Sequence, residues 1–187
     1  MALDQAIAVI EVPATGGDDA FKDLTVPAVY LNPGELSLMV FVDAPGFALN
    51  SLDFRPTAQP PSIYPAALAA RTGVVELTDL SGGTAGRGLI RNLGRAGSSV
   101  TFGVVSARGG EAILRFRYQG TVGKPLPYSL KVGDAKEIPL EIPSTGGEWK
   151  TFDVAVRLQP GANRVTLAGL VDGWDAIALD SLELVAR

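Results

Sequence analysis

Apolar residues fall on every second position through most of the chain, a pattern that predicts half-buried β-strands rather than helices. Turn-forming Gly, Pro, Asn and Asp residues separate the alternating runs. The one helical candidate, Pro65–Ala70, would make about one and a half turns and is too short to be stable alone. The fold class expected is therefore all-β, an antiparallel sandwich or jelly roll. The clearest runs are Leu36–Val42, Ser99–Val104, Leu114–Tyr118, Tyr128–Val132 and Phe152–Leu158.

An internal repeat divides the chain. Three short segments recur in the same order, 127 to 130 positions apart. Generic turn chemistry would explain one such match but not three. We therefore interpret residues 1–54 as the C-terminal half of a sandwich module, residues 73–187 as a complete module, and the proline-rich residues 55–72 as a linker. The matched pairs are Glu11–Gly17 with Glu141–Gly147, Leu31–Gly34 with Leu158–Gly161, and Ala48–Phe54 with Ala178–Leu184.

Half a sandwich exposes an apolar sheet face and unpaired strand edges, so residues 1–54 need something to cover them. Three arrangements are open at this point. The segment can pack on a second copy of itself, on the complete module of the same chain, or on a further segment of a parent protein.

The amino-acid composition excludes several classes of function. The chain has no Cys and no His, which excludes a Ser-His-Asp triad, a Cys nucleophile and a His/Cys zinc site. A net charge of -4 gives no basic footprint, so neither nucleic acid nor a membrane surface is an expected partner. No two of the 20 carboxylates are singled out as a glycosidase pair, and no catalytic residue is predicted.

Six segments of residues 73–187 carry a family resemblance: Val75–Gly83, Val100–Val104, Leu114–Tyr118, Pro143–Trp149, Leu158–Asn163 and Leu179–Leu182. Together they resemble the carbohydrate-binding modules of families 6 and 35, which have a galactose-binding-like jelly-roll fold. Pro13–Gly17, Leu31–Gly34 and Gly46–Asn50 resemble the C-terminal half of the same modules.

The resemblance implies a non-catalytic module that binds a polysaccharide or oligosaccharide and targets a larger bacterial glycoside hydrolase to its substrate. It also implies an extracellular or cell-surface location, with any signal peptide outside these 187 residues. The alternative is a structural β-sandwich that spaces neighbouring domains and binds no sugar.

The resemblance further implies a structural calcium ion held between the first and last strands. Glu76 and Asp180 stand at acidic positions of the opening and closing segments, and oxygen ligands are what calcium prefers. Val74 occupies a position where the family usually has another acid. The alternative is that Glu76 and Asp180 are solvated charges at strand ends.

A sugar site needs an exposed aromatic ring for the C–H face of a pyranose and polar groups for its hydroxyls. Trp174 lies in a polar loop that borders the binding cleft in these families, with Asp172 and Asp175 beside it as hydroxyl acceptors. The alternative role for Trp174 is a plug over the end of the sandwich.

Trp149 follows the Thr-Gly-Gly turn, one place from the family's usual Trp, and is expected either to form one wall of the cleft or to lie in the core. Leu89 stands where many relatives have an opposing aromatic residue, which favours a shallower site. Arg91 and Asn92 are then the candidates for polar contacts.

Overall fold

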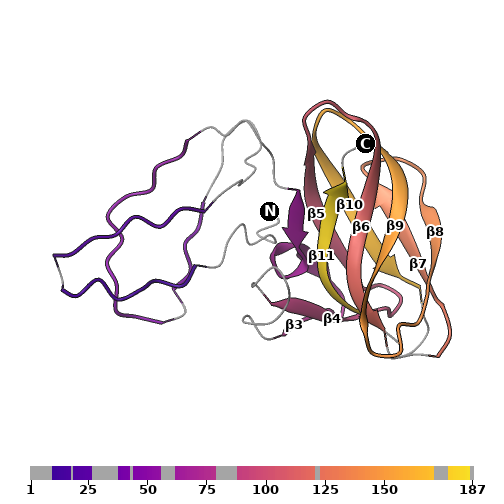
Figure 1. Ribbon diagram of the computed structural model, residues 1–187, viewed down its shortest axis with the longest axis horizontal. Coiled ribbons are helices and arrows are strands. Elements are labelled where there is room, and N and C mark those ends of the chain that lie inside the picture. The colour runs from indigo at the N-terminus through magenta and orange to yellow at the C-terminus, as the bar shows by residue number, and fades with distance from the viewer. Residues whose placement is uncertain are drawn as a thin grey trace.

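The computed structural model describes residues 10–17, 19–26, 38–42, 44–55, 62–78, 88–120, 123–170 and 177–185. The described residues from 63 onward form two antiparallel β-sheets that face one another, and one short 3-10 helix, η1 (Ala66–Leu68) (Figure 1). This confirms the all-β antiparallel sandwich predicted from the alternation. Within the described part of the chain, no helix has the length and apolar character needed to cross a bilayer.

The larger sheet has six strands in the order β3-β4-β11-β6-β9, and β1 pairs with β11 alongside the stretch Ser181–Glu183. The smaller sheet has five strands in the order β2-β5-β10-β7-β8. The larger sheet contains β1 (Ile63–Pro65), β3 (Glu76–Thr78), β4 (Leu89–Leu93), β6 (Gly110–Gly120), β9 (Trp149–Leu158) and β11 (Ile177–Val185). The smaller contains β2 (Ala70–Thr72), β5 (Ser99–Ser106), β7 (Leu126–Val132), β8 (Ile138–Ile142) and β10 (Gly161–Gly169).

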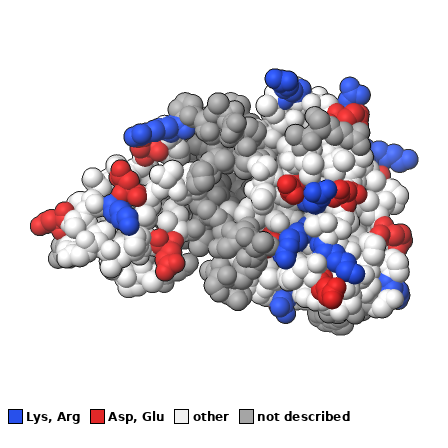
Figure 2. All heavy atoms as spheres, in the orientation of Figure 1, with Lys and Arg blue, Asp and Glu red and all other residues white. Residues whose placement is uncertain are grey.

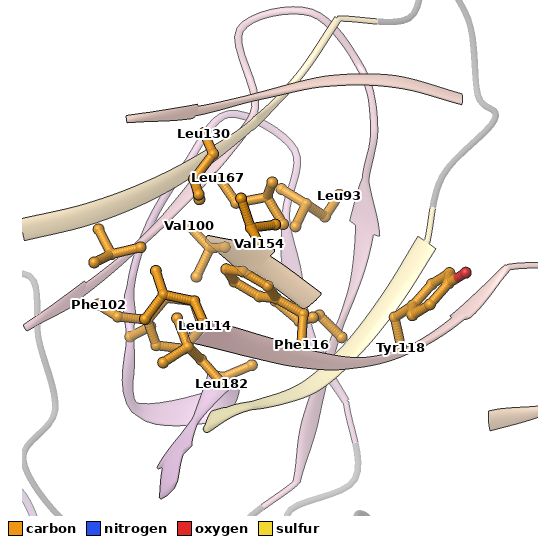
Figure 3. Close-up of a cluster of buried hydrophobic side chains, with 14 of the residues drawn as sticks. Leu93, Val100, Phe102, Leu114, Phe116, Tyr118, Leu130, Val154, Leu167 and Leu182 are labelled. Carbon is orange, nitrogen blue, oxygen red and sulfur yellow. The ribbon is translucent and has the colours of Figure 1, made fainter. Parts of the chain in front are cut away.

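The core lies between the two sheets, where the alternate residues of each strand meet (Figure 3). Phe116 of β6 is fully buried at its centre. Its ring stacks on Phe152 of β9 with centroids 4.9 Å apart and meets Phe102 of β5 edge-on at 6.3 Å. Since Phe102 belongs to the opposite sheet, this aromatic contact joins the two layers.

The sandwich begins earlier than the sequence predicted. Residues 63–72, assigned above to the linker, form β1, η1 and β2, and Tyr64, Ala66 and Ala69 are buried in the core. The Tyr64 hydroxyl also accepts a hydrogen bond from the Val105 amide at 2.9 Å. Proline therefore did not mark a linker here, because Pro65 ends β1 in the extended conformation that its ring imposes.

The described residues between 10 and 55 form no strand and are almost all exposed (Figure 1). Leu38–Val42, predicted as part of a strand, has no sheet partner, and Phe41 is 79% exposed. The hydrogen bonds that join described residues here are local, such as the Ala20 amide to the Gly17 carbonyl. An alternating sequence supplies a strand's two faces but not the neighbouring strand that completes its hydrogen bonds.

We expect Phe116→Ala to lower the free energy of unfolding by about 3–5 kcal/mol, because it empties the contact between the sheets. Phe41→Ala removes the same side chain from an exposed position and should change it by less than about 0.5 kcal/mol. Urea unfolding followed by near-ultraviolet circular dichroism measures both. Equal losses in the two variants would show that the core does not lie where the structure places it.

Candidate functional site

One end of the sandwich carries the three predicted sugar-binding residues that the structure describes, Trp149, Arg91 and Asn92, and we call it the loop end. Here β4, β11, β6 and β9 finish or start side by side, since Leu93 and Gly120 both pair with Ile177, and Gln119 pairs with Trp149. Tyr128 of β7 ties the two sheets together at this end by donating its hydroxyl proton to the Leu93 carbonyl. Burial raises the pKa of this phenol further above its ordinary value.

The turn before β9 is fixed to the end of β6. The buried Thr145 donates from its hydroxyl to the Gly120 carbonyl at 2.8 Å and accepts from the Gly120 amide at 3.0 Å. Gly146 and Gly147 both adopt left-handed backbone conformations, with φ of 67° and 86°, which glycine allows at little cost. The turn therefore sets where Trp149 enters the sheet.

Trp149 lies outside the hydrophobic core, half-buried on the outer face of the larger sheet. The guanidinium carbon of Arg117, from the neighbouring strand β6, lies 4.6 Å from the centroid of its ring. Arg117 in turn donates to a carboxylate oxygen of Asp180 on β11 at 2.9 Å. Of the two roles predicted for Trp149, its position disfavours the core.

The row Trp149, Arg117, Asp180 spans three neighbouring strands. Its carboxylate is fully buried, whereas the side chain of Arg117 is 31% exposed. A buried carboxylate is costly unless a cation neutralises it, so Arg117 is held between Asp180 and the indole ring. We name this row the outer row.

A second row lies beside it on the same face. Arg115 donates to both carboxylate oxygens of Asp153, at 2.8 and 2.9 Å, and lies 3.9 Å from Glu183. The hydrogen bond from Arg115 lowers the pKa of the Asp153 carboxyl. On the face shown in Figure 2, basic and acidic side chains of the described residues alternate in this way rather than gathering by sign.

The arginines of β6 are not among the candidate residues named from the sequence, so Arg117 was missed. Their alternation with the buried Leu114, Phe116 and Tyr118 placed them on the outer face. Arg117 pairs with Ser181, and Asp180 falls at an irregularity in the pairing of β11 with β6, between Leu179 and Ser181. No periodicity in the sequence reveals such a shift.

Arg91 and Asn92 lie on β4, at the same end of the sheet as Trp149 but separated from β9 by β11 and β6. Asn92 has a φ of 62°, and β4 has one residue more than β11 between their two paired positions. This bulge leaves Arg91 exposed and Asn92 half-buried. The structure thus brings the predicted polar residues to the loop end. They lie three strand spacings from Trp149, a distance on the order of 14 Å.

Trp174, Asp172 and Asp175 lie outside the described residues, and their roles stay predictions. The described residues on either side of them, Leu170 and Ile177, lie at the loop end. Leu170 donates its amide proton to the Pro127 carbonyl at 3.2 Å, and Ile177 pairs with Gly120.

Glu76 and Asp180, the predicted calcium ligands, are not brought together. Glu76 is exposed on β3, opposite Arg91, and β4 separates β3 from β11. The strand that does pair with β11 beside Asp180 is β1, which with η1 offers only the apolar run Ile63–Leu68. Within the described ranges no three acidic side chains gather to hold a metal ion. Arg117 supplies a positive charge to Asp180, and the calcium ion stays a prediction.

We expect Arg117→Ala to lower the free energy of unfolding by about 2–3 kcal/mol, because it removes a cation that pairs with a buried carboxylate. Arg115→Ala is the matched control on the same strand and face, and its loss should be much smaller because Asp153 is exposed to water. Urea unfolding is measured with calcium and with a chelator. A loss for Arg117→Ala that calcium abolishes would contradict the assignment of Arg117 as the partner of Asp180.

Comparison with solved structures bears on the fold. The chain is similar to part of an exo-β-1,3-galactanase from Phanerochaete chrysosporium solved with galactose (TM-score 0.57, 22% identity, 66% of this chain and 29% of the galactanase). It is also similar to part of an isomaltodextranase from Arthrobacter globiformis complexed with panose (TM-score 0.54, 26% identity, 67% of this chain and 24% of that enzyme). The chain thus spans less than a third of either enzyme.

A family 35 carbohydrate-binding module from Clostridium thermocellum is matched over 98% of its length and 66% of this chain, with a TM-score of 0.60 and 16% identity. No protein-family model and no curated protein matches the sequence. The region of similarity is thus a fraction of two enzymes and nearly the whole of one binding module. The chain has the fold of a carbohydrate-binding module.

Proposed function

We propose that the sandwich beginning at Ile63 is a non-catalytic module that binds a polysaccharide or oligosaccharide at its loop end. The observation that carries the proposal is the placement of Trp149. A large aromatic side chain lies outside the core, at the loop end, directly after a turn that is fixed to the end of β6. The near-complete match to a carbohydrate-binding module supports the same conclusion.

The outer row gives the chemistry of recognition. Arg117 covers part of the indole of Trp149, and the rest is available to the apolar face of a pyranose ring. Guanidinium N–H groups not used by Asp180 can donate to sugar hydroxyls or to a uronic acid carboxylate. Because the guanidinium of Arg117 already contacts both Asp180 and Trp149, the Arg117 side chain loses little rotamer freedom when a ligand binds.

The finer features remain part of the proposal. A module of this kind would hold a catalytic domain near its polymer, which raises the effective concentration of substrate. Such polymers lie outside the cell, so we propose an extracellular or cell-surface location and a glycoside hydrolase as the parent protein. Trp174, with Asp172 and Asp175, would then form the second side of the site.

The test is affinity electrophoresis of the full chain through gels that contain single polysaccharides, including β-1,3-galactan and dextran. We expect one glycan to retard the wild type, and Trp149→Ala to weaken this binding by about tenfold or more, since a stacked aromatic contributes about 1–3 kcal/mol. Phe41→Ala, which removes an exposed aromatic from residues 10–55, should migrate as the wild type does. Circular dichroism checks that each variant is folded.

Two outcomes would contradict the proposal. Folded protein that no glycan retards would favour the structural spacer, in which Trp149 and Arg117 only brace the sheet. Retardation that survives Trp149→Ala unchanged would place the sugar elsewhere on the molecule.

A further inference from the structure

Among the described strands, those of the second half of the sandwich, β8–β11, form no hydrogen-bonded ladder with one another. Strand β8 pairs with β7, β9 with β6, β10 with β5 and β7, and β11 with β1, β4 and β6. Every partner of β8–β11 therefore belongs to β1–β7. A polypeptide with only the β8–β11 pattern has no strand to pair with, however apolar its core face is.

Residues 10–54 carry that pattern position by position. The repeat extends beyond its three short segments, because Phe21–Val26 aligns with Trp149–Val154, and Leu38, Val40 and Val42 align with alternate residues of β10. Every buried aliphatic residue of β8, β10 and β11 has an apolar counterpart in residues 10–54. The pairs are Ile142 with Val12, Val165 with Leu38, Leu167 with Val40, Ile177 with Phe47, Leu179 with Leu49 and Leu182 with Leu52.

These counterparts are uncovered in the structure. The six side chains of residues 10–54 in that set are 41–55% exposed, whereas their equivalents in the sandwich are at most 2% exposed. Thr15 shows the same difference. Its equivalent Thr145 is anchored to Gly120 of β6, but the Thr15 hydroxyl donates only to the nearby Gly17 carbonyl, at 3.4 Å.

Charge points to the same kind of partner. Glu183 of β11 lies 3.9 Å from Arg115 of β6, across the boundary between the two halves. Its counterpart in the repeat is Asp53, which keeps the negative charge and faces only its neighbour Arg55. A partner strand equivalent to β6 would place a basic residue opposite Asp53.

We propose that residues 10–54 are the second half of another sandwich and that their partner is a polypeptide segment with the strand pattern of β1–β7. A second copy of this chain does not meet the need. These 187 residues contain one first half, residues 63–132, and two second halves, residues 10–54 and 138–185. Any assembly made only of copies of these 187 residues leaves one second half unpaired for each copy. This inference does not depend on whether the complete sandwich binds sugar.

The test restores the missing half. A copy of residues 62–137 is placed through a flexible linker before Met1 of the full chain, and amide hydrogen exchange is followed by mass spectrometry. In the unmodified chain we expect residues 47–54 to exchange at nearly the unprotected rate. In the extended chain their exchange should slow by about a hundredfold or more, as expected for amides in a folded sheet. The matched control carries a copy of residues 138–185 instead and should leave residues 47–54 unprotected.

Two variants of the extended chain separate a specific fit from loose collapse. Leu49→Asp places a charge at a core position and should abolish the protection, whereas Asp53→Asn changes only the outward face and should keep it. The proposal is overturned if the first-half copy gives no protection, or if both halves protect equally. It is also overturned if the unmodified chain dimerises, by sedimentation, with residues 47–54 protected.

Discussion

The pairing of each second-half strand with first-half strands is the constraint on which the rest of the structure depends. It interleaves the two halves, so the core around Phe116 forms only when both are present. It also brings the ends of β6 and β9 together, and with them Trp149 and Arg117. The same constraint explains why residues 10–55, with equally good alternation, form no described strand. Sheet structure here comes from complementary partners rather than from local propensity.

The outer face of the larger sheet links stability to recognition. Asp180 is buried and depends on Arg117 for its counter-charge, and Arg117 lies against Trp149. A side chain that stabilises the sheet thereby also orients the aromatic ring proposed to meet a sugar. Among the described residues, the positive charge beside Asp180 is the guanidinium of Arg117, whereas the calcium ion that the family resemblance implied stays a prediction.

Alternation predicted the fold class and four of the longer strands correctly, because a period of two directly reports which face of a strand is buried. It failed at Leu38–Val42, whose partner strands the sequence does not supply, and at residues 63–72, where prolines suggested a linker but Tyr64 and Ala66 pack into the core. At the candidate site, Trp149 could be named from its turn. Arg117 and the separation of Glu76 from Asp180 depend on strand order and a register shift, which no local pattern encodes.

The central claim is that a sugar meets the indole of Trp149 at the loop end. The chain has two tryptophans, so a ¹⁵N-labelled sample gives two indole N–H signals that a Trp149→Phe variant assigns. Titration with oligosaccharides of the retarding glycan should shift the Trp149 signal in a saturable manner, in step with the fraction bound. Saturable binding by calorimetry with no change in that signal would contradict the account.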